Sequence, residues 1–198
     1  MTSIYFVRHA QPDYEWEEDH TRPLTAEGAR DSEKVYETLK DIKLDHAFSS
    51  PYKRSIDTIR HCADSHGLEI FTDARLRERT KGANGNIYGM FQRRWSDFDY
   101  HEEGGESLSQ VQKRNIEALF EILDRHQDEN ILIGTHGTAL STILNYYDQN
   151  YGCSNFLRMI DYMPYIIRMD FKGRKCVGKE ELLIVEKEYK GRKRADKH

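Results

Sequence analysis

The amino-acid sequence predicts an α/β domain with a mostly parallel central sheet. Short runs rich in β-branched and aromatic residues recur along the chain, and longer stretches with helical spacing of apolar residues separate them. At 198 residues the chain has the length of one domain with its own core. We therefore expect a single domain over residues 1–187, followed by a basic tail over 188–198 whose composition indicates disorder.

Six segments have the composition of strands. Each is short and rich in apolar or β-branched residues. They are residues 3–7, 45–49, 69–72, 130–134, 165–171 and 182–185. Helices should fill most of the gaps between them, as in other α/β domains.

The first two predicted helices have recognisable starts. Thr25 is a plausible N-cap for the first, which should end before Lys43. Pro51 lies where the second should begin, and apolar positions at helical spacing continue up to Gly67. Arg54 lies in the first turn of that helix, where a cation is unfavourable to the helix dipole. An anion bound to Arg54 would explain this placement.

The second half of the chain has two further helical segments and an insertion. Apolar spacing predicts a helix over 106–125, and another over 138–147 directly after Gly137. We interpret the region of about 80–105 as an inserted irregular loop, because its pattern breaks down into glycines and scattered aromatics. Its large apolar residues could form a substrate lid or a small hydrophobic cluster; they are Tyr88, Met90, Phe91, Trp95, Phe98 and Tyr100.

Composition argues against several classes of function. The chain has 30 basic and 34 acidic residues and a net charge of -4, so no excess of positive charge would hold a nucleic acid. Its three cysteines are widely separated and include no C-x-x-C pair, which argues against a zinc or disulfide framework. The apolar run at residues 4–7 is too short for a signal peptide or a membrane span. We therefore expect a cytoplasmic protein with no nucleic-acid or membrane partner.

Charged side chains follow four of the predicted strands. They are, in chain order, Arg8 and His9, Arg54, Glu78, and His136. In an open parallel sheet the C-terminal ends of the strands form one edge, and ligands bind in the crevice outside it. Two histidines and two arginines at that edge predict a cationic pocket for a tetrahedral phosphate dianion.

These residue types suit a two-step phosphoryl transfer. A neutral imidazole at His9 can attack phosphorus and form a phosphohistidine that water then cleaves. A carboxylic acid at Glu78 could protonate the leaving group and then take a proton from the attacking water. His136 and the arginines would hold the charge of the transferred group, and backbone amides at Ala10 and Gly137 could add donors. Such a scheme needs no metal and no cofactor.

Four motifs resemble, in order and spacing, those of the histidine phosphatase superfamily, which includes the cofactor-dependent phosphoglycerate mutases. They are residues 6–10 (FVRHA), 49–55 (SSPYKRS), 76–79 (LRER) and 134–137 (GTHG). Agreement of four separate motifs makes the resemblance specific. It implies the three-layer α/β/α sandwich of the phosphoglycerate mutase-like fold. It also implies that His9 is phosphorylated, that Glu78 is the proton donor, and that the phosphoryl group is bound by Arg8, Arg54 and His136.

Departures from the mutase branch bear on the substrate. The first motif is followed by residues 11–14 (QPDY) and an acidic run over 15–19, where mutases typically have Glu, Ser or Thr and a nearby Asn. After Gly137 the chain lacks the Asn-Ser-x-Arg pattern by which a sequence resembles the mutase branch. We therefore favour a metal-independent phosphatase for a small phosphate monoester, and we count Gln11 and Gly137 among its substrate-binding residues.

Two other functions stay open at this point. A phosphoglycerate mutase would share the whole catalytic core. A non-catalytic module that binds phosphate esters would keep the pocket and lose turnover. The sequence also allows both a monomer and a homodimer.

Several single residues have alternative interpretations. Glu78 could pair with Arg77 and Arg79 on the surface while another carboxylate acts as the acid. The competing carboxylates are Glu69, Glu102, Glu103 and Glu106. Arg93 and Arg94 could reach a second anionic group of the substrate. We expect the remaining histidines to be structural or exposed; they are His20, His46, His61, His66, His101, His126 and His198.

Overall fold

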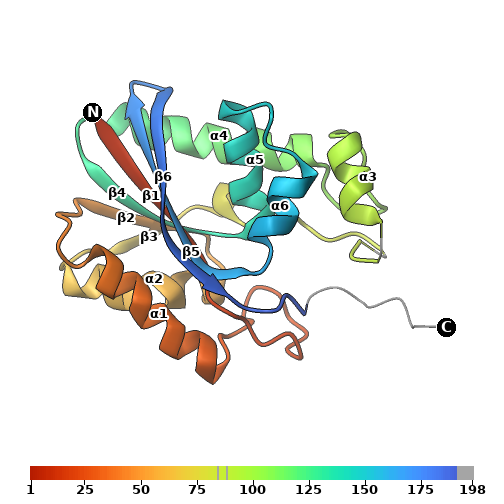
Figure 1. Ribbon diagram of the computed structural model, residues 1–198, viewed down its shortest axis with the longest axis horizontal. Helices are drawn as coiled ribbons and strands as arrows, with labels where there is room; N and C mark the ends of the chain where they lie inside the picture. Colours follow the sequence, from red (N-terminus) through yellow and green to blue (C-terminus); the bar gives the residue numbers. More distant parts are fainter. Residues whose placement is uncertain (84, 88, 191–198) are drawn as a thin grey trace.

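The computed structural model describes residues 1–83, 85–87 and 89–190, and its centre is a six-stranded sheet (Figure 1). The strand order is β3-β2-β4-β1-β5-β6. Strands β1 to β4 run parallel, whereas β5 is antiparallel to both β1 and β6. The strands are β1 (Thr2–Arg8), β2 (His46–Ser49), β3 (Ile70–Thr72), β4 (Asn130–Thr135), β5 (Tyr162–Lys172) and β6 (Lys175–Glu186). The predicted α/β class with a mostly parallel sheet is confirmed.

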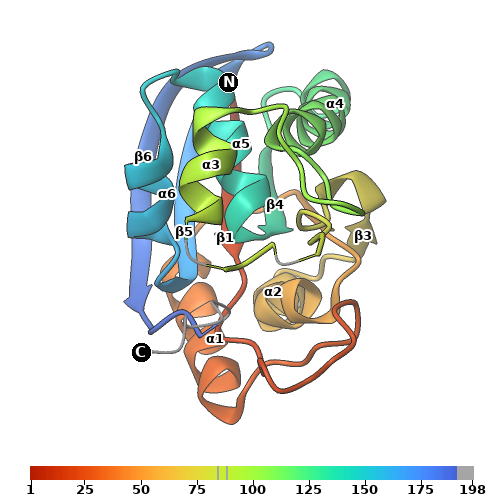
Figure 2. The same cartoon turned by 90° about the vertical axis from the view of Figure 1, so that its right-hand side faces the viewer.

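Helices cover both faces of the sheet and complete the three layers (Figures 1 and 2). Two helices, α1 (Ala26–Leu39) and α2 (Lys53–Ser65), pack on one face. On the other face lie α4 (Leu108–Arg125) and α5 (Gly137–Tyr147). A short 3₁₀ helix, η1 (Ala74–Leu76), follows β3.

Side chains of β1 alternate between the two layers. Ile4 and Phe6 pack with residues of α4 and α5, whereas Tyr5 and Val7 pack with residues of α1 and α2. This alternation follows from strand geometry, in which successive side chains point to opposite faces. All four side chains are buried. Packing on both faces therefore fixes the end of β1, and with it the position of His9.

The helices begin close to the predicted positions. Thr25 is the N-cap of α1, and its hydroxyl accepts a hydrogen bond from the backbone N–H of Gly28 at 2.9 Å. Helix α2 begins two residues after Pro51, with Tyr52 as N-cap. Ser107 caps α4 and forms a capping box with Gln110.

The prediction that the region of about 80–105 is wholly irregular is wrong. It contains the helix α3 (Met90–Ser96), which begins after Gly89. Gly89 has a φ of 86°, a left-handed conformation that glycine adopts without steric cost. Asn84 and Tyr88 lie outside the described residues.

A small separate cluster of apolar side chains holds α3 in place. Phe91 and Trp95 pack against Phe156 of another short helix, α6 (Cys153–Met159), with ring centroids 5.3 and 5.8 Å from that of Phe156. This agrees with the interpretation of the insertion as a satellite hydrophobic cluster, and Phe91 and Phe156 also line the pocket described below, so a role as a substrate lid stays a prediction. Both helices have seven residues, so their stability depends on this mutual packing rather than on their own hydrogen bonds.

A buried ion network joins the insertion to the rest of the domain. Glu102 lies between Arg79 and Arg94, at 3.1 Å from Arg79 Nη1 and in direct contact with the guanidinium of Arg94. All three side chains are at most 5% exposed. Because a buried charge is costly unless it is paired, this network strongly favours one arrangement of the segment.

The chain after β6 is ordered for longer than predicted. The tail was expected from residue 188, but the backbone N–H of Tyr189 donates to Asp161 at 2.9 Å, and its ring packs edge-on against Tyr14 at 5.6 Å. Residues 191–198 lie outside the described part. Within the described part, no helix is long and apolar enough to cross a membrane. A cytoplasmic location and a monomeric or homodimeric state stay predictions.

Candidate active site

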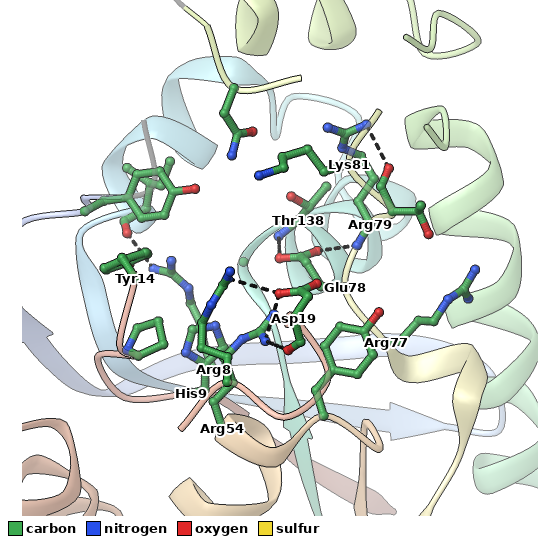
Figure 3. Close-up of a pocket in the computed structure, with 18 of the residues that line it drawn as sticks. Arg8, His9, Tyr14, Asp19, Arg54, Arg77, Glu78, Arg79, Lys81 and Thr138 are labelled. Atoms are coloured by element: carbon green, nitrogen blue, oxygen red, sulfur yellow. Dashed lines mark hydrogen bonds and ion pairs between the residues drawn. The ribbon is translucent and has the colours of Figure 1, made fainter. Parts of the chain in front are cut away.

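The C-terminal ends of the parallel strands meet at one edge of the sheet. Ser49 pairs in register with Gly134, and Arg8 pairs with Thr135. The segments that follow these strands surround a pocket of about 430 Å³ (Figure 3). Five of the seven residues predicted for the site line this pocket: Arg8, His9, Arg54, Glu78 and Gly137.

His9 presents a neutral imidazole to the pocket. Its Nδ1 lies 2.7 Å from the carbonyl oxygen of Ala10, which can only accept, so Nδ1 carries the proton. The free lone pair is then on Nε2. Burial lowers the pKa of His9 well below its ordinary value, and the charges of Arg54 and Arg8 lower it further. The ring is therefore uncharged and can act as a nucleophile.

Arg8 is held against the backbone of the segment around α6 and β5. Its Nη1 donates to the carbonyl oxygens of Met159, Ile160 and Tyr162 at 2.6, 2.8 and 2.9 Å. Its Nε is buried and has no hydrogen-bond partner within the described chain, so it can donate to an anion. A Cβ at Gly137 would lie 3.1 Å from this Nε, which explains why glycine suits that position.

In this structure the anion bound to Arg54 is Asp19. Arg54 Nη1 lies 3.1 Å from a carboxylate oxygen of Asp19 and donates to its carbonyl oxygen at 2.7 Å. Arg22 pairs with the same carboxylate oxygen at 3.0 Å. The side chain of Arg54 is 4% exposed and that of Asp19 is 44% exposed. The acidic run that follows the first motif thus folds over the pocket, and Glu17 and Asp19 line it.

Glu78 is held at the N-terminus of α5 (Figure 3). One carboxylate oxygen accepts from the backbone N–H of Thr138 at 3.0 Å. The other accepts from the backbone N–H groups of Ala139 at 3.1 Å and Arg79 at 2.8 Å. These three donors, two of them at a helix N-terminus, fix the carboxyl group in the pocket wall.

The structure does not show the alternative in which Glu78 pairs with Arg77 and Arg79 on the surface. The guanidinium of Arg77 pairs with Glu106 at 2.9 Å, and that of Arg79 pairs with Glu102. The Glu106 carboxylate also binds Arg114, and although burial opposes the shift, these contacts lower its pKa to about 2. Glu102 and Glu106 are therefore ion-paired carboxylates, whereas Glu78 lines the pocket.

His136 is fully buried and lies next to His9 without being part of the pocket wall. The two ring centroids are 5.3 Å apart in an edge-on arrangement. Nε2 of His136 lies 2.7 Å from the hydroxyl of Ser50, and Nδ1 has no partner among the described residues. Burial, with the charge of Arg54, lowers the pKa of His136 well below its ordinary value. The structure thus places a second neutral imidazole against the first.

Two predicted contacts are not found. Gln11 was expected to bind substrate, but its side-chain oxygen accepts from the hydroxyl of Thr25 at 3.0 Å, because this segment packs on the start of α1. The backbone N–H of Ala10 was expected to face an anion, but it donates to the hydroxyl of Thr58 at 2.9 Å. Arg93 lies over the ring of Tyr100 at 3.9 Å.

Several pocket residues were not predicted individually. Tyr14, Tyr52, Thr138 and Tyr189 all line the pocket. Tyr14 follows the first motif closely, and Tyr52 lies two residues before Arg54, so proximity to the motifs was a usable signal. No local signal marks Tyr189, which reaches the pocket through the packing of the chain after β6.

Among the described residues, the group with spacing suitable for a metal ion lies away from this pocket. It consists of His46, His126 and Glu129. None of the three lines the pocket around His9.

Sequence comparisons match most of the chain. A family model described as the histidine phosphatase superfamily, branch 1, matches residues 4–179. The chain is 32% identical over 158 residues to phosphoglycerate mutase-like protein 4 of Arabidopsis thaliana. This alignment covers 71% of this chain and 68% of that protein. It is 27% identical over 165 residues to a probable phosphoglycerate mutase of an Enterobacter species, with 73% and 74% covered.

Solved structures share the fold. A mycobacterial glucosyl-3-phosphoglycerate phosphatase superposes with a TM-score of 0.71 at 16% identity, covering 94% of this chain and 99% of that one. A phosphoserine phosphatase of Entamoeba histolytica, in complex with 3-phosphoglyceric acid, superposes with a TM-score of 0.76 at 18% identity, covering 92% and 98%. At these identities the likeness concerns the fold.

Proposed function

The chain belongs to the histidine phosphatase superfamily, branch 1, and from that premise we propose that it is a metal-independent phosphatase that hydrolyses a small phosphate monoester through a phosphohistidine at His9. One observation carries the proposal. His9 is a neutral imidazole in the wall of a pocket, with its proton on Nδ1 and its lone pair on Nε2. Guanidinium groups of Arg8 and Arg54 lie in the same wall and match a phosphate dianion.

In the first step, Nε2 of His9 attacks the phosphorus atom as the bond from phosphorus to the leaving oxygen breaks. The carboxyl group of Glu78 donates its proton to that oxygen, so an alcohol leaves and a carboxylate remains. Arg8 and Arg54 stabilise the negative charge on the three peripheral oxygens. His136 contacts His9 edge-on from outside the pocket wall and positions the ring of the nucleophile.

In the second step, water attacks the phosphorus atom of phosphohistidine. The carboxylate of Glu78 takes a proton from this water, the bond between nitrogen and phosphorus breaks, and inorganic phosphate is released. His9 returns to its neutral form and Glu78 returns to its protonated form. The two steps use the same groups in opposite directions.

The charge of the pocket does not separate hydrolysis from mutase activity. A bisphosphate-primed mutase must hold a molecule with two phosphate groups in this pocket. Glu17 and Asp19 line it together with seven basic side chains, so its charge accepts such a polyanion as well as a monoester. Our preference for hydrolysis therefore rests on the departures from the mutases at residues 11–19. Mutase activity is the alternative function, because relatives at 27 to 32% identity carry the name phosphoglycerate mutase or a name derived from it.

A phosphatase assay separates these functions. Purified protein in excess EDTA should release inorganic phosphate from p-nitrophenyl phosphate and from some members of a panel of sugar phosphates, nucleotides, phosphoamino acids and phosphoglycerates. Interconversion of 3-phosphoglycerate and 2-phosphoglycerate, faster than hydrolysis and stimulated by the 2,3-bisphosphate, would instead establish the mutase. Binding of phosphate esters without turnover would establish a binding module.

Replacing Asp19 with asparagine should strengthen phosphate binding. The wild-type carboxylate competes with substrate for Arg54, and asparagine removes its charge while keeping its size. Because the pair is partly exposed, we expect KM and the inhibition constant of inorganic phosphate to fall about 2- to 5-fold. Initial-rate kinetics measure both constants. Glu15→Gln, which neutralises an exposed residue of the same acidic run outside the pocket wall, is the matched control. An increase in KM for Asp19→Asn would show that Asp19 binds substrate.

A further inference from the structure

Two histidines and a glutamate meet at the edge of the sheet opposite the pocket. His46 is the first residue of β2, and Glu129 directly precedes β4. His126 is the C-cap of α4. Figure 1 shows the end of α4 and the starts of β1 and β4 on one side of the molecule. The pocket lies at the other ends of these strands, and since β4 has six residues, the separation is about 20 Å.

The three side chains converge on one point. The same carboxylate oxygen of Glu129 lies 2.9 Å from Nδ1 of His126 and 3.1 Å from Nε2 of His46. The two imidazole rings have centroids 4.1 Å apart and are tilted by 49°. One ligand atom from each residue can be chosen so that no two are more than 4.8 Å apart. Tetrahedral zinc holds its ligand atoms about 3.3 Å apart, as bond lengths of about 2.0–2.1 Å require.

We propose that His46, His126 and Glu129 form a site for a zinc ion. Two imidazole nitrogens and one carboxylate oxygen are ligands that zinc prefers, whereas calcium and magnesium require oxygen ligands. The side chains of His46, His126 and Glu129 are 34, 20 and 37% exposed. The site is therefore open to solvent, and water can complete the tetrahedron.

A zinc ion at this position would tie the start of β2 to the end of α4 and the turn that follows it, which lie 80 residues further along the chain. The ligands come from the start of β2, the end of α4 and the turn that leads into β4. In that turn Asp128 has a positive φ of 61°, a conformation that non-glycine residues adopt at some cost. Binding energy available only to the folded chain stabilises it. We assign this site a structural role, separate from the phosphoryl-transfer chemistry about 20 Å away.

The experiment measures zinc binding and thermal stability of the full chain. Wild-type protein, freed of metal with EDTA and exchanged into chelator-free buffer, should take up one zinc ion per chain in competition with a chromophoric chelator. Zinc should raise Tm by about 3–6 °C for each tenfold excess over its Kd, and calcium and magnesium should not. In His46→Ala and in His126→Ala, the affinity for zinc should fall at least about 10-fold, as expected when a ligand is lost.

A matched control is His61→Ala. His61 is a surface histidine that contacts a carboxylate, Glu33, and among the described residues it belongs to no group of three that could hold a metal ion. This variant should bind zinc like the wild type, and its Tm should rise by the same amount when zinc is added. The proposal is wrong if wild type shows no stoichiometric uptake, or if His46→Ala and His126→Ala retain wild-type affinity. Phosphatase activity is measured separately, with and without zinc. Absence of that activity would contradict the proposed function and would not bear on zinc binding.

Discussion

Replacing His9 with alanine is expected to reduce kcat for phosphate-ester hydrolysis by at least about 10⁴-fold. The variant loses the only group proposed to form the covalent intermediate, and the remaining arginines cannot substitute for a nucleophile. Wild-type enzyme mixed with p-nitrophenyl phosphate and quenched rapidly in alkali should carry a phosphoryl group, labile in acid, on a fraction of the chains. Intact-mass analysis of the quenched protein measures it, and His9→Ala should carry none.

A folding defect is separated from a chemical one by two further measurements. His9 lies in the pocket wall, so alanine enlarges an existing pocket and leaves no closed cavity, and the Tm of the variant should stay close to that of wild type. Inorganic phosphate should still protect His9→Ala against unfolding, because Arg8 and Arg54 remain. His61→Ala, which removes an exposed imidazole, is the control for the activity assay. Turnover by His9→Ala at the wild-type rate would exclude His9 as the nucleophile.

The edge of the sheet that carries the candidate site was predictable because it depends on a general property of parallel strands. Arg8 ends β1 and His136 directly follows β4, and both strands are short apolar runs that any α/β reading identifies. Once four strands are parallel, their C-terminal ends must lie together. The position of His9 at that edge follows from chain order alone, whereas Glu78 lies six residues after β3 and is held there by the first turn of α5.

The contacts that occupy these groups were not predictable. Asp19 on Arg54, Gln11 on Thr25 and Tyr189 against Tyr14 join segments whose relative position is set by loop conformation. Loops have no periodic pattern from which side-chain direction can be read.

The sequence did not predict the short helices α3 and α6, because tertiary contacts stabilise them and no local pattern marks them. Helices α3 and α6 have too few residues for a helical repeat, and their packing on each other holds them. Strand β6 was predicted only over 182–185 but extends over Lys175–Glu186. Its first half is polar because it is an edge strand, and charged residues at an edge discourage pairing with other chains.

Replacing Glu78 with glutamine is expected to slow hydrolysis of an alkyl phosphate by about 10²- to 10⁴-fold, the usual contribution of a general acid. Glutamine keeps the shape, and its oxygen can accept from Ala139 and Arg79, but its amide nitrogen then faces the backbone N–H of Thr138, so the Tm of the variant is measured together with its activity. It cannot donate the proton that an alkoxide leaving group requires. Glu69→Gln, which alters an exposed carboxylate directly before β3 and outside the pocket wall, is the matched control.

The choice of substrate distinguishes a proton donor from a residue that only positions the helix. The p-nitrophenolate ion leaves without protonation, so in Glu78→Gln the first step should be nearly normal with p-nitrophenyl phosphate. The second step still needs a base to take a proton from water, so phosphohistidine should accumulate and appear as a burst of p-nitrophenol. Equal slowing of alkyl and p-nitrophenyl esters, with no burst and no accumulated phosphoenzyme, would show that Glu78 acts through α5 and not through proton transfer. A burst would assign Glu78 the role of base in the second step, and slower phosphorylation of His9 by the alkyl ester than by the p-nitrophenyl ester would assign it the role of acid in the first.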